Sequence, residues 1–348
     1  MKPNFDIILN RLKIESEQDI NWTLDLDCFI LQIISIPATN WIWVIASEEN
    51  IFLVDTEKGE IVKEFRAIAE FIFSAVIHPK TNDLFIASSN GVFLLTTHES
   101  KRVLIDEKDW FEHIAISSDG SVIFVAKGRA LYILEQNRDA YELLSKDDSF
   151  ESTISDIIFN IDSFLVSNYG SVREYKTKDF EDYQLFKWKT SLLTTSWSTD
   201  KKYIVAGTQE NIIHFWPYPF EEEKDFQISG YQSKVTKMIW TNDASEFVVN
   251  CSEDVQIWDF SDGPPTGKSP VMLKCGYGKI TDIHYKGNLL IATSEKGLIF
   301  YFLPTDTDKY VQMHSVGAKI SCISVNDDES EVYVGSKSGM LYGLEIVI

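Results

Sequence analysis

The 348-residue chain carries 53 acidic and 32 basic side chains, which gives a formal net charge of −21. A protein that grips nucleic acid without sequence preference, or that adsorbs to anionic lipid, needs a basic surface, so this charge argues against both functions. With 44% hydrophobic and 13% aromatic residues the chain is not disordered. Its length suits either two average domains or one large all-β domain.

The first residues, 1–11, are not expected to form a signal peptide, because Asp6 and Asn10 interrupt a short apolar run. No segment approaches about 20 apolar residues, so we expect no membrane insertion. The four cysteines, at positions 28, 251, 275 and 322, form no Cys-x-x-Cys pair. They indicate a reducing compartment without a metal site. We therefore expect the protein in the cytoplasm, with the nucleus as the alternative.

A unit of about forty residues repeats along the chain. Large apolar residues that end a strand just before a polar turn recur at intervals of 38 to 45 residues. This spacing is typical of the four-stranded blades of a β-propeller. The residues that mark the repeat are Ile36, Ile77, Ile116, Phe159, Trp197, Trp240, Tyr285 and Val325.

Each repeat has the same order of turns and strands. A turn rich in Asn, Asp and Gly comes first, as in 118–120 and 242–244, because these residues tolerate left-handed backbone. An apolar strand that ends in small residues follows, as in 85–88 and 204–207. A third strand such as 254–259 and a more polar fourth strand such as 61–65 complete the unit. Polar residues on an outer strand discourage unwanted edge pairing.

The segment 252–260 is the clearest of these units, with an acidic turn followed by Val-Gln-Ile-Trp-Asp at 255–259. At 212–216 the tryptophan is kept as Trp216, and Pro217 replaces the aspartate. Through these units the chain resembles the WD40-repeat superfamily over nearly its whole length. The Gly-His pair of that family is absent, and Gly230-Tyr231 occupies the equivalent place. The resemblance therefore implies a β-propeller whose blades are held mainly by apolar packing.

We predict an all-β fold in which residues 1–348 form one domain, an eight-bladed WD40-like β-propeller. The N-terminal strand, 5–14, is expected to join the last blade and close the ring, with 15–27 as the connection into the first blade. The alternative is seven blades with an irregular segment 1–66 packed outside. The predicted blades are 28–66, 71–105, 110–144, 154–188, 192–228, 235–275, 280–313 and 320–346 with 5–14.

The sequence contains no motif for a nucleophile or a metal cluster. In a propeller, however, several blades can contribute ligands to the central channel. Asp119, Asp156 and Asp282 are candidates near channel-facing turns, and paired acids there could hold a cation. Hydrogen bonds at turns and strand starts explain these residues better. We expect no catalytic residue, metal or cofactor, and keep a channel-sited metal-dependent hydrolase or lyase as one alternative.

The loops that lead into the first and third strands form one face of the ring, and in the WD40 superfamily that face commonly binds peptides. Aromatic and basic residues favoured at interfaces occur in these loops. We predict a protein-binding face there, formed by Trp110, Arg129, Tyr169, Trp188, Lys189, Tyr231 and Tyr277.

A second candidate surface follows Trp216 on the opposite face and comprises Tyr218, Phe220, Glu221, Glu222 and Glu223. The predicted function is a non-catalytic scaffold or adaptor, either a monomer or a subunit of a hetero-complex, that binds another protein or peptide. That partner could be basic, since the chain is acidic. The other alternative is an acidic inhibitor or sequestering partner of a basic protein.

Overall fold

The computed structural model of the protein describes residues 14–15, 20–47, 50–66, 70–104, 110–138, 140–160, 162–176, 179–221, 224–274, 278–287, 289–302 and 312–346. Strands joined by turns make up these ranges. None of them contains a helical stretch with the length and apolarity needed to cross a bilayer.

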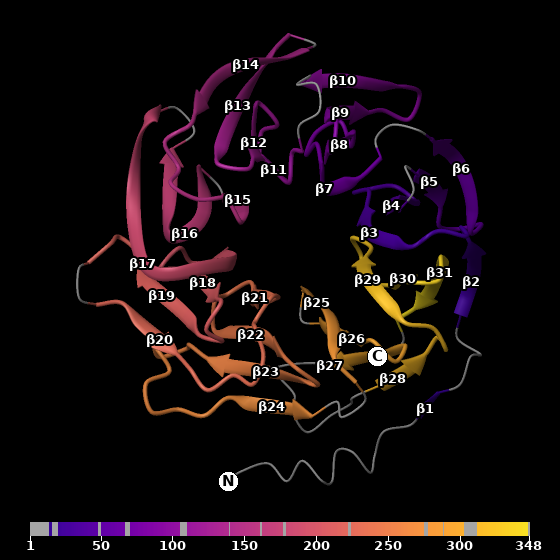
Figure 1. Ribbon diagram of the computed structural model, residues 1–348. Coiled ribbons are helices and arrows are strands. Elements are labelled where there is room, and N and C mark those ends of the chain that lie inside the picture. The colour runs from indigo at the N-terminus through magenta and orange to yellow at the C-terminus, as the bar shows by residue number, and fades with distance from the viewer. Residues whose placement is uncertain are drawn as a thin grey trace.

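The strands form seven hydrogen-bonded sheets arranged in a ring, as Figure 1 shows, and this architecture confirms the predicted all-β propeller. Four of the sheets are regular antiparallel units of four consecutive strands. The strands of these four sheets are β3 (Ile30–Ser35), β4 (Trp41–Ala46), β5 (Ile51–Asp55) and β6 (Glu60–Phe65); β7 (Ile72–Ile77), β8 (Leu84–Ser88), β9 (Gly91–Leu95) and β10 (Ser100–Leu104); β11 (His113–Ile116), β12 (Val122–Lys127), β13 (Ala130–Asn137) and β14 (Ala140–Asp147); and β21 (Met238–Trp240), β22 (Glu246–Cys251), β23 (Asp254–Asp259) and β24 (Val271–Lys274).

One sheet is larger and spans two of the predicted repeats. Its long strand β16 pairs with β15 through residues 163–167 and with β17 through residues 169–176. Strand β17 in turn pairs with β16 up to Ser191 and with β18 from Leu192 onward. The six strands are β15 (Asp156–Asn160), β16 (Ser163–Lys176), β17 (Asp179–Trp197), β18 (Tyr203–Thr208), β19 (Ile213–Pro217) and β20 (Phe226–Ile228).

The prediction of eight separate blades is therefore wrong, because the predicted blades 154–188 and 192–228 are merged into this six-stranded sheet. The alternative count of seven agrees with the number of sheets. That alternative also predicted an irregular segment 1–66 outside the ring, and this part is wrong, because residues 30–65 form a regular sheet of the ring.

The last two sheets include strands from the N-terminal region. A short strand, β1, pairs in parallel with the outer strand β28, and β2 pairs antiparallel with β31. The first of these sheets contains β25 (Ile280–Lys286), β26 (Leu289–Ser294), β27 (Leu298–Phe302), β28 (Gln312–Ser315) and β1 (Ile14–Glu15); the second contains β29 (Ile320–Val325), β30 (Glu331–Ser336), β31 (Met340–Glu345) and β2 (Ile20–Asp25).

An N-terminal strand thus completes the last sheet, as predicted, but the strand is 20–25 and not 5–14. The predicted connection 15–27 contains this strand, and residues 5–13 lie outside the described part of the chain. Half-buried Ile20, Trp22 and Leu24 alternate with exposed residues, so one face of this strand packs against the adjoining apolar clusters while the other meets solvent.

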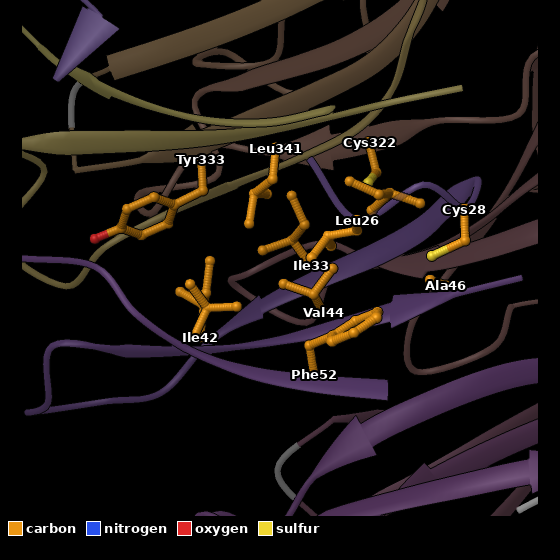
Figure 2. Close-up of a cluster of buried hydrophobic side chains, with 12 residues drawn as sticks. Leu26, Cys28, Ile33, Ile42, Val44, Ala46, Phe52, Cys322, Tyr333 and Leu341 are labelled. Carbon is orange, nitrogen blue, oxygen red and sulfur yellow. The ribbon is translucent and has the colours of Figure 1, made fainter. Parts of the chain in front are cut away.

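The first and last sheets of the ring are held together by side-chain packing and by hydrogen bonds. Figure 2 shows Ile42, Val44 and Phe52 facing Tyr333 and Leu341 across this junction. At the inner strands, the Ser321 hydroxyl donates to the carbonyl of Ile30 at 2.6 Å, and the Ser35 and Ser324 hydroxyls lie 2.8 Å apart. The ring is therefore closed by contacts between residues almost 300 positions apart.

The second and third strands of most sheets are buried on both faces. Strand β8 is buried along its whole length, and β4 is buried at all but its first residue. A strand covered by neighbouring sheets on both sides needs continuous apolar side chains instead of alternating ones. Outer strands are partly solvated, so β6 leaves Ile61 and Val62 exposed.

Candidate functional site

One face of the ring is built from the loops that lead into the first strands and from the turns between second and third strands. We call it the loop face. Main-chain hydrogen bonds join these two kinds of segment: Ser89 N donates to Phe71 O at 2.9 Å, Phe111 N to Ser88 O at 3.0 Å, and Ile154 N to Gly128 O at 2.8 Å. The loops are therefore fixed to the sheets that carry them.

Three aromatic rings from two neighbouring sheets form a cluster on the loop face, which we call the aromatic patch: Phe71, Phe73 and Trp110. Phe73 and Trp110 have ring centroids 5.3 Å apart, and Phe71 lies 6.0 Å from Trp110. The exposed fractions are 49% for Phe71, 38% for Phe73 and 54% for Trp110. Single exposed aromatic residues are common, but a contiguous cluster indicates an interaction surface.

A groove runs beside the aromatic patch, between β3 and β7. It has a volume of about 550 Å³ and adjoins a smaller hollow of about 160 Å³ with which it shares Leu31, Ile72 and Phe73. The volume of the larger hollow lies within the range typical of ligand sites. We call it the loop-face groove, and its lining residues are Leu31, Ala46, Ser47, Glu70, Phe71, Ile72 and Phe73.

A shared local irregularity places Leu31 and Phe73 at the surface. The pairing of β3 with β4 goes from Ile30 to Gln32 and skips Leu31. The pairing of β7 with β8 goes from Ile72 to Ser74 and skips Phe73. Such a bulge turns the extra residue out of the normal alternation. It exposes one large apolar side chain on each side of the loop-face groove.

Equivalent bulges occur elsewhere in the ring without an apolar exposed side chain. The skipped residues are Thr281 in β25 and Ser321 in β29, and in β17 the skipped residue is Leu193, which is half-buried. Among these bulges, exposed apolar residues are thus confined to β3 and β7, which strengthens the case for a site between those two strands.

Sequence reasoning found Trp110 but missed Phe71, Phe73 and Leu31. Segment 71–73 is a continuous apolar run, Phe-Ile-Phe, which is typical of a buried strand, and the bulge that exposes Phe73 leaves no mark in that pattern. The only available signal was the coincidence of a large apolar residue at the same repeat position in two successive units.

The structure places the other predicted residues of the loop face in two groups. Arg129 is exposed in a turn and Tyr169 is exposed within β16, where Tyr169 N donates to the Ser152 hydroxyl oxygen at 2.9 Å. Trp188 is half-buried, with its ring stacked 3.8 Å from that of His214, and Lys189 lies over the Trp188 ring at 5.1 Å. Within the described residues, no ring contact joins any of these four residues to the aromatic patch.

Tyr231 is not available as a surface anchor, which corrects its assignment to the binding face. It is buried, with 7% of its surface exposed, and its hydroxyl accepts a hydrogen bond from Trp258 Nε1 at 3.0 Å. Burial raises the pKa of the Tyr231 hydroxyl. This residue instead holds Trp258, the tryptophan of the clearest repeat, by a hydrogen bond that the sequence analysis did not predict. Tyr277 lies outside the described residues.

The second candidate surface is mostly occupied by contacts within the protein. The Tyr218 hydroxyl lies 3.1 Å from Glu174 Oε1 and accepts from Lys176 Nζ at 2.9 Å. Phe220 is exposed on one side and packs edge-on against Phe186 at 5.4 Å.

Of the acidic residues that follow, Glu221 is paired with Lys224, and Glu222 and Glu223 lie outside the described residues. The described part of this surface therefore offers one exposed aromatic ring instead of a cluster.

The carboxylates Asp156 and Asp282 each have partners from neighbouring repeats. Asp156 Oδ2 accepts from Thr195 N at 2.7 Å and from the Thr195 hydroxyl at 2.8 Å. Asp282 forms an ion pair with Lys237 at 3.0 Å and accepts from Ile323 N at 3.4 Å. Burial raises the pKa of Asp156. Both carboxylates are therefore engaged in structural contacts, and these contacts join neighbouring repeats instead of serving only the residues' own strand starts.

Asp119 lies in the turn between β11 and β12, at the opposite end of these strands from the loop face. Hydrogen bonds from Ser121 and Ser117 lower its pKa to about 2. It therefore stabilises its own turn. In the described ranges there is no group of three or more His, Cys, Asp or Glu side chains placed to hold a metal ion.

No family model matches the chain. Over 151 residues the chain is 19% identical to the chicken (Gallus gallus) serine-threonine kinase receptor-associated protein, and the match spans 43% of this chain and 41% of that protein. The crystal structure of the computationally designed Ika8 protein superposes with a TM-score of 0.77 at 15% identity, covering 94% of this chain and 100% of the Ika8 chain. At that identity the likeness shows the fold alone. The protein is an all-β propeller, and its repeats resemble those of the WD40 superfamily.

Proposed function

We propose that the protein is a non-catalytic, cytoplasmic scaffold or adaptor that binds another protein through the loop face. The observation that carries this proposal is the aromatic patch of Phe71, Phe73 and Trp110 beside the loop-face groove. Large exposed rings that can be fully desolvated are the usual centres of binding energy in protein interfaces.

The backbone beneath the patch favours binding, because it is fixed before a partner arrives. Phe71 N donates to the Ser89 hydroxyl at 3.1 Å, and Ser89 N donates back to Phe71 O. Trp110 precedes Phe111, which is buried and bonded to Ser88. A preorganised surface loses little conformational entropy on association.

The proposal is tested by site-specific photo-crosslinking in cells. Phe71 is replaced by p-benzoylphenylalanine, and the same amino acid replaces Leu144, an apolar residue of the outer strand β14 that is 48% exposed. We expect defined protein adducts from position 71 and none of the same mass from position 144. Phe73→Ala combined with Trp110→Ala should remove the adducts, because each truncated hot-spot residue costs at least about tenfold in affinity.

The same adducts from both positions, or adducts from position 71 that persist in the double variant, would contradict the proposal. Far-ultraviolet circular dichroism of the double variant serves as the folding control, since the exposed rings contribute little to the core.

A further inference from the structure

We propose that the loop-face groove takes a short linear peptide segment in which an aliphatic or aromatic anchor side chain lies next to a lysine or arginine. This inference rests on the proposed function, namely that a protein partner binds the loop face. It adds the chemical class of the segment that is recognised and the residues that select it.

The shape of the groove favours a linear segment over a flat protein surface. The hollow is concave, and its volume of about 550 Å³ holds a few side chains. Leu31 and Phe73 project from β3 and β7 on its two sides, and Ile72 lies between the two hollows. An inserted apolar side chain would be covered by these groups, which is how extended or helical peptides gain affinity from a groove.

One hydrogen bond joins the two sheets beside the groove, and others fix the backbone of one wall. Gln32 Nε2, from β3, donates to Ala75 O of β7 at 3.4 Å. Within the β7 sheet the Phe71 backbone is bonded to Ser89 in both directions. A peptide therefore meets a wall whose backbone is already in place.

The charges around the groove favour a cationic segment. The leading loops of β3, β7 and β11 carry one acid each, and of these Glu70 lines the groove, whereas Glu112 Oε2 accepts from Gly128 N at 2.9 Å. The described residues of these loops, 26–29, 70–71 and 110–112, include no lysine or arginine. The Trp110 ring, which packs against Phe71 and Phe73 of the groove lining, is a good partner for a cation.

The overall charge of the protein disfavours the competing occupants of this surface. With a formal net charge of −21, a second copy of the chain is repelled at long range, and so are nucleic acid and anionic lipid. A basic peptide segment is attracted by the same field. A peptide that carries both the apolar anchor and the adjacent cation should therefore bind the groove better than a peptide that carries only one of them.

The test uses the purified full chain and a phage-displayed library of random nine-residue peptides. Enriched peptides are synthesised with a fluorescein label, and their dissociation constants are measured by fluorescence anisotropy. We expect enrichment of Leu, Ile, Phe or Trp within about three residues of Lys or Arg. Phe73→Ala should weaken these peptides about tenfold or more, because the anchor loses its cover.

Charge reversal gives the decisive comparison. Glu70→Lys should invert the preference, so that peptides with Glu or Asp beside the anchor are enriched. Glu142→Lys, the same charge change on the exposed outer strand β14, should leave the preference unchanged.

Three outcomes would overturn the inference: no enriched peptide, enrichment without basic residues, or equal effects of the two charge reversals. If crosslinking from position 71 still succeeds in any of these cases, the proposed function stands and only the peptide chemistry is wrong.

Discussion

The contact that closes the ring can be tested with a single methyl group. Trp22 of β2 pairs with Gly343 of β31, and its indole lies flat over that glycine. A Cβ added at Gly343 would lie 2.3 Å from Cε2 and 2.5 Å from Nε1 of Trp22. Carbon atoms in contact are normally about 3.5–4.0 Å apart, so the ring would have to move by more than about 1 Å.

Gly343→Ala is therefore expected to destabilise the protein by about 1–3 kcal/mol through overpacking. In a Trp22→Ala background the clash is gone, and alanine should be slightly better than glycine in a strand, by about 0.5 kcal/mol. The double-mutant cycle should thus give a coupling energy of about 2 kcal/mol.

Urea denaturation followed by circular dichroism measures the four free energies of unfolding, with a constant m-value as the check that the transitions are comparable. Gly207→Ala is the matched control, because its Cβ would lie 2.6 Å from the carbonyl oxygen of Val235 and would not meet Trp22. Its cost should be the same in both backgrounds. If Gly343→Ala also costs the same with and without Trp22, β2 does not close the ring in the way described.

Two further predictions concern buried charged and titratable groups. Burial lowers the pKa of His214 to about 4; because the unfolded state protonates near pH 6.5, stability should fall as the pH drops below that value and level off below about 4. The free energy of unfolding should fall by about 2 kcal/mol by pH 5. Urea denaturation from pH 7 to 4.5 should show a smaller fall for His214→Phe than for the unchanged protein. If the two proteins lose stability in parallel, His214 is not the cause. Arg173→Lys should lower stability by about 1–3 kcal/mol, because the buried guanidinium bonds Asp147 at 3.1 Å and the Ser149 carbonyl at 3.1 Å. The exposed pair of Arg66 with Glu64 is the control, and Arg66→Lys should leave the urea midpoint unchanged; equal effects of both substitutions would refute the argument.

The sequence was sufficient to predict the propeller because inner strands such as β4 and β8 are buried on both faces. Burial on both faces requires runs of apolar residues, and these runs recur at a regular spacing along the chain. The number of sheets could not be predicted in the same way. Whether two repeats share one sheet depends on hydrogen-bond continuity through β16 and β17, and the apolar pattern is the same in either case.

The site was predicted only in part for a similar reason. Trp110 lies in a loop outside the apolar pattern of the strands, so its exposure could be predicted. Phe73 and Leu31 are exposed by bulges, which shift pairing by one residue without changing composition. Tyr231 is the opposite case, because a loop aromatic residue that was predicted to be exposed is buried. Its hydroxyl accepts a hydrogen bond from Trp258.

The pairing of β2 with β31 has a consequence for biosynthesis. Strand β2 is made long before its partner β31, because all the other sheets of the ring lie between them in the sequence. In that interval Trp22 can reach Gly59 of the β5–β6 turn but not Gly343 of β31. The last sheet therefore stays incomplete until β31 has been made, and chaperones that shield exposed apolar strands would be needed most during that interval.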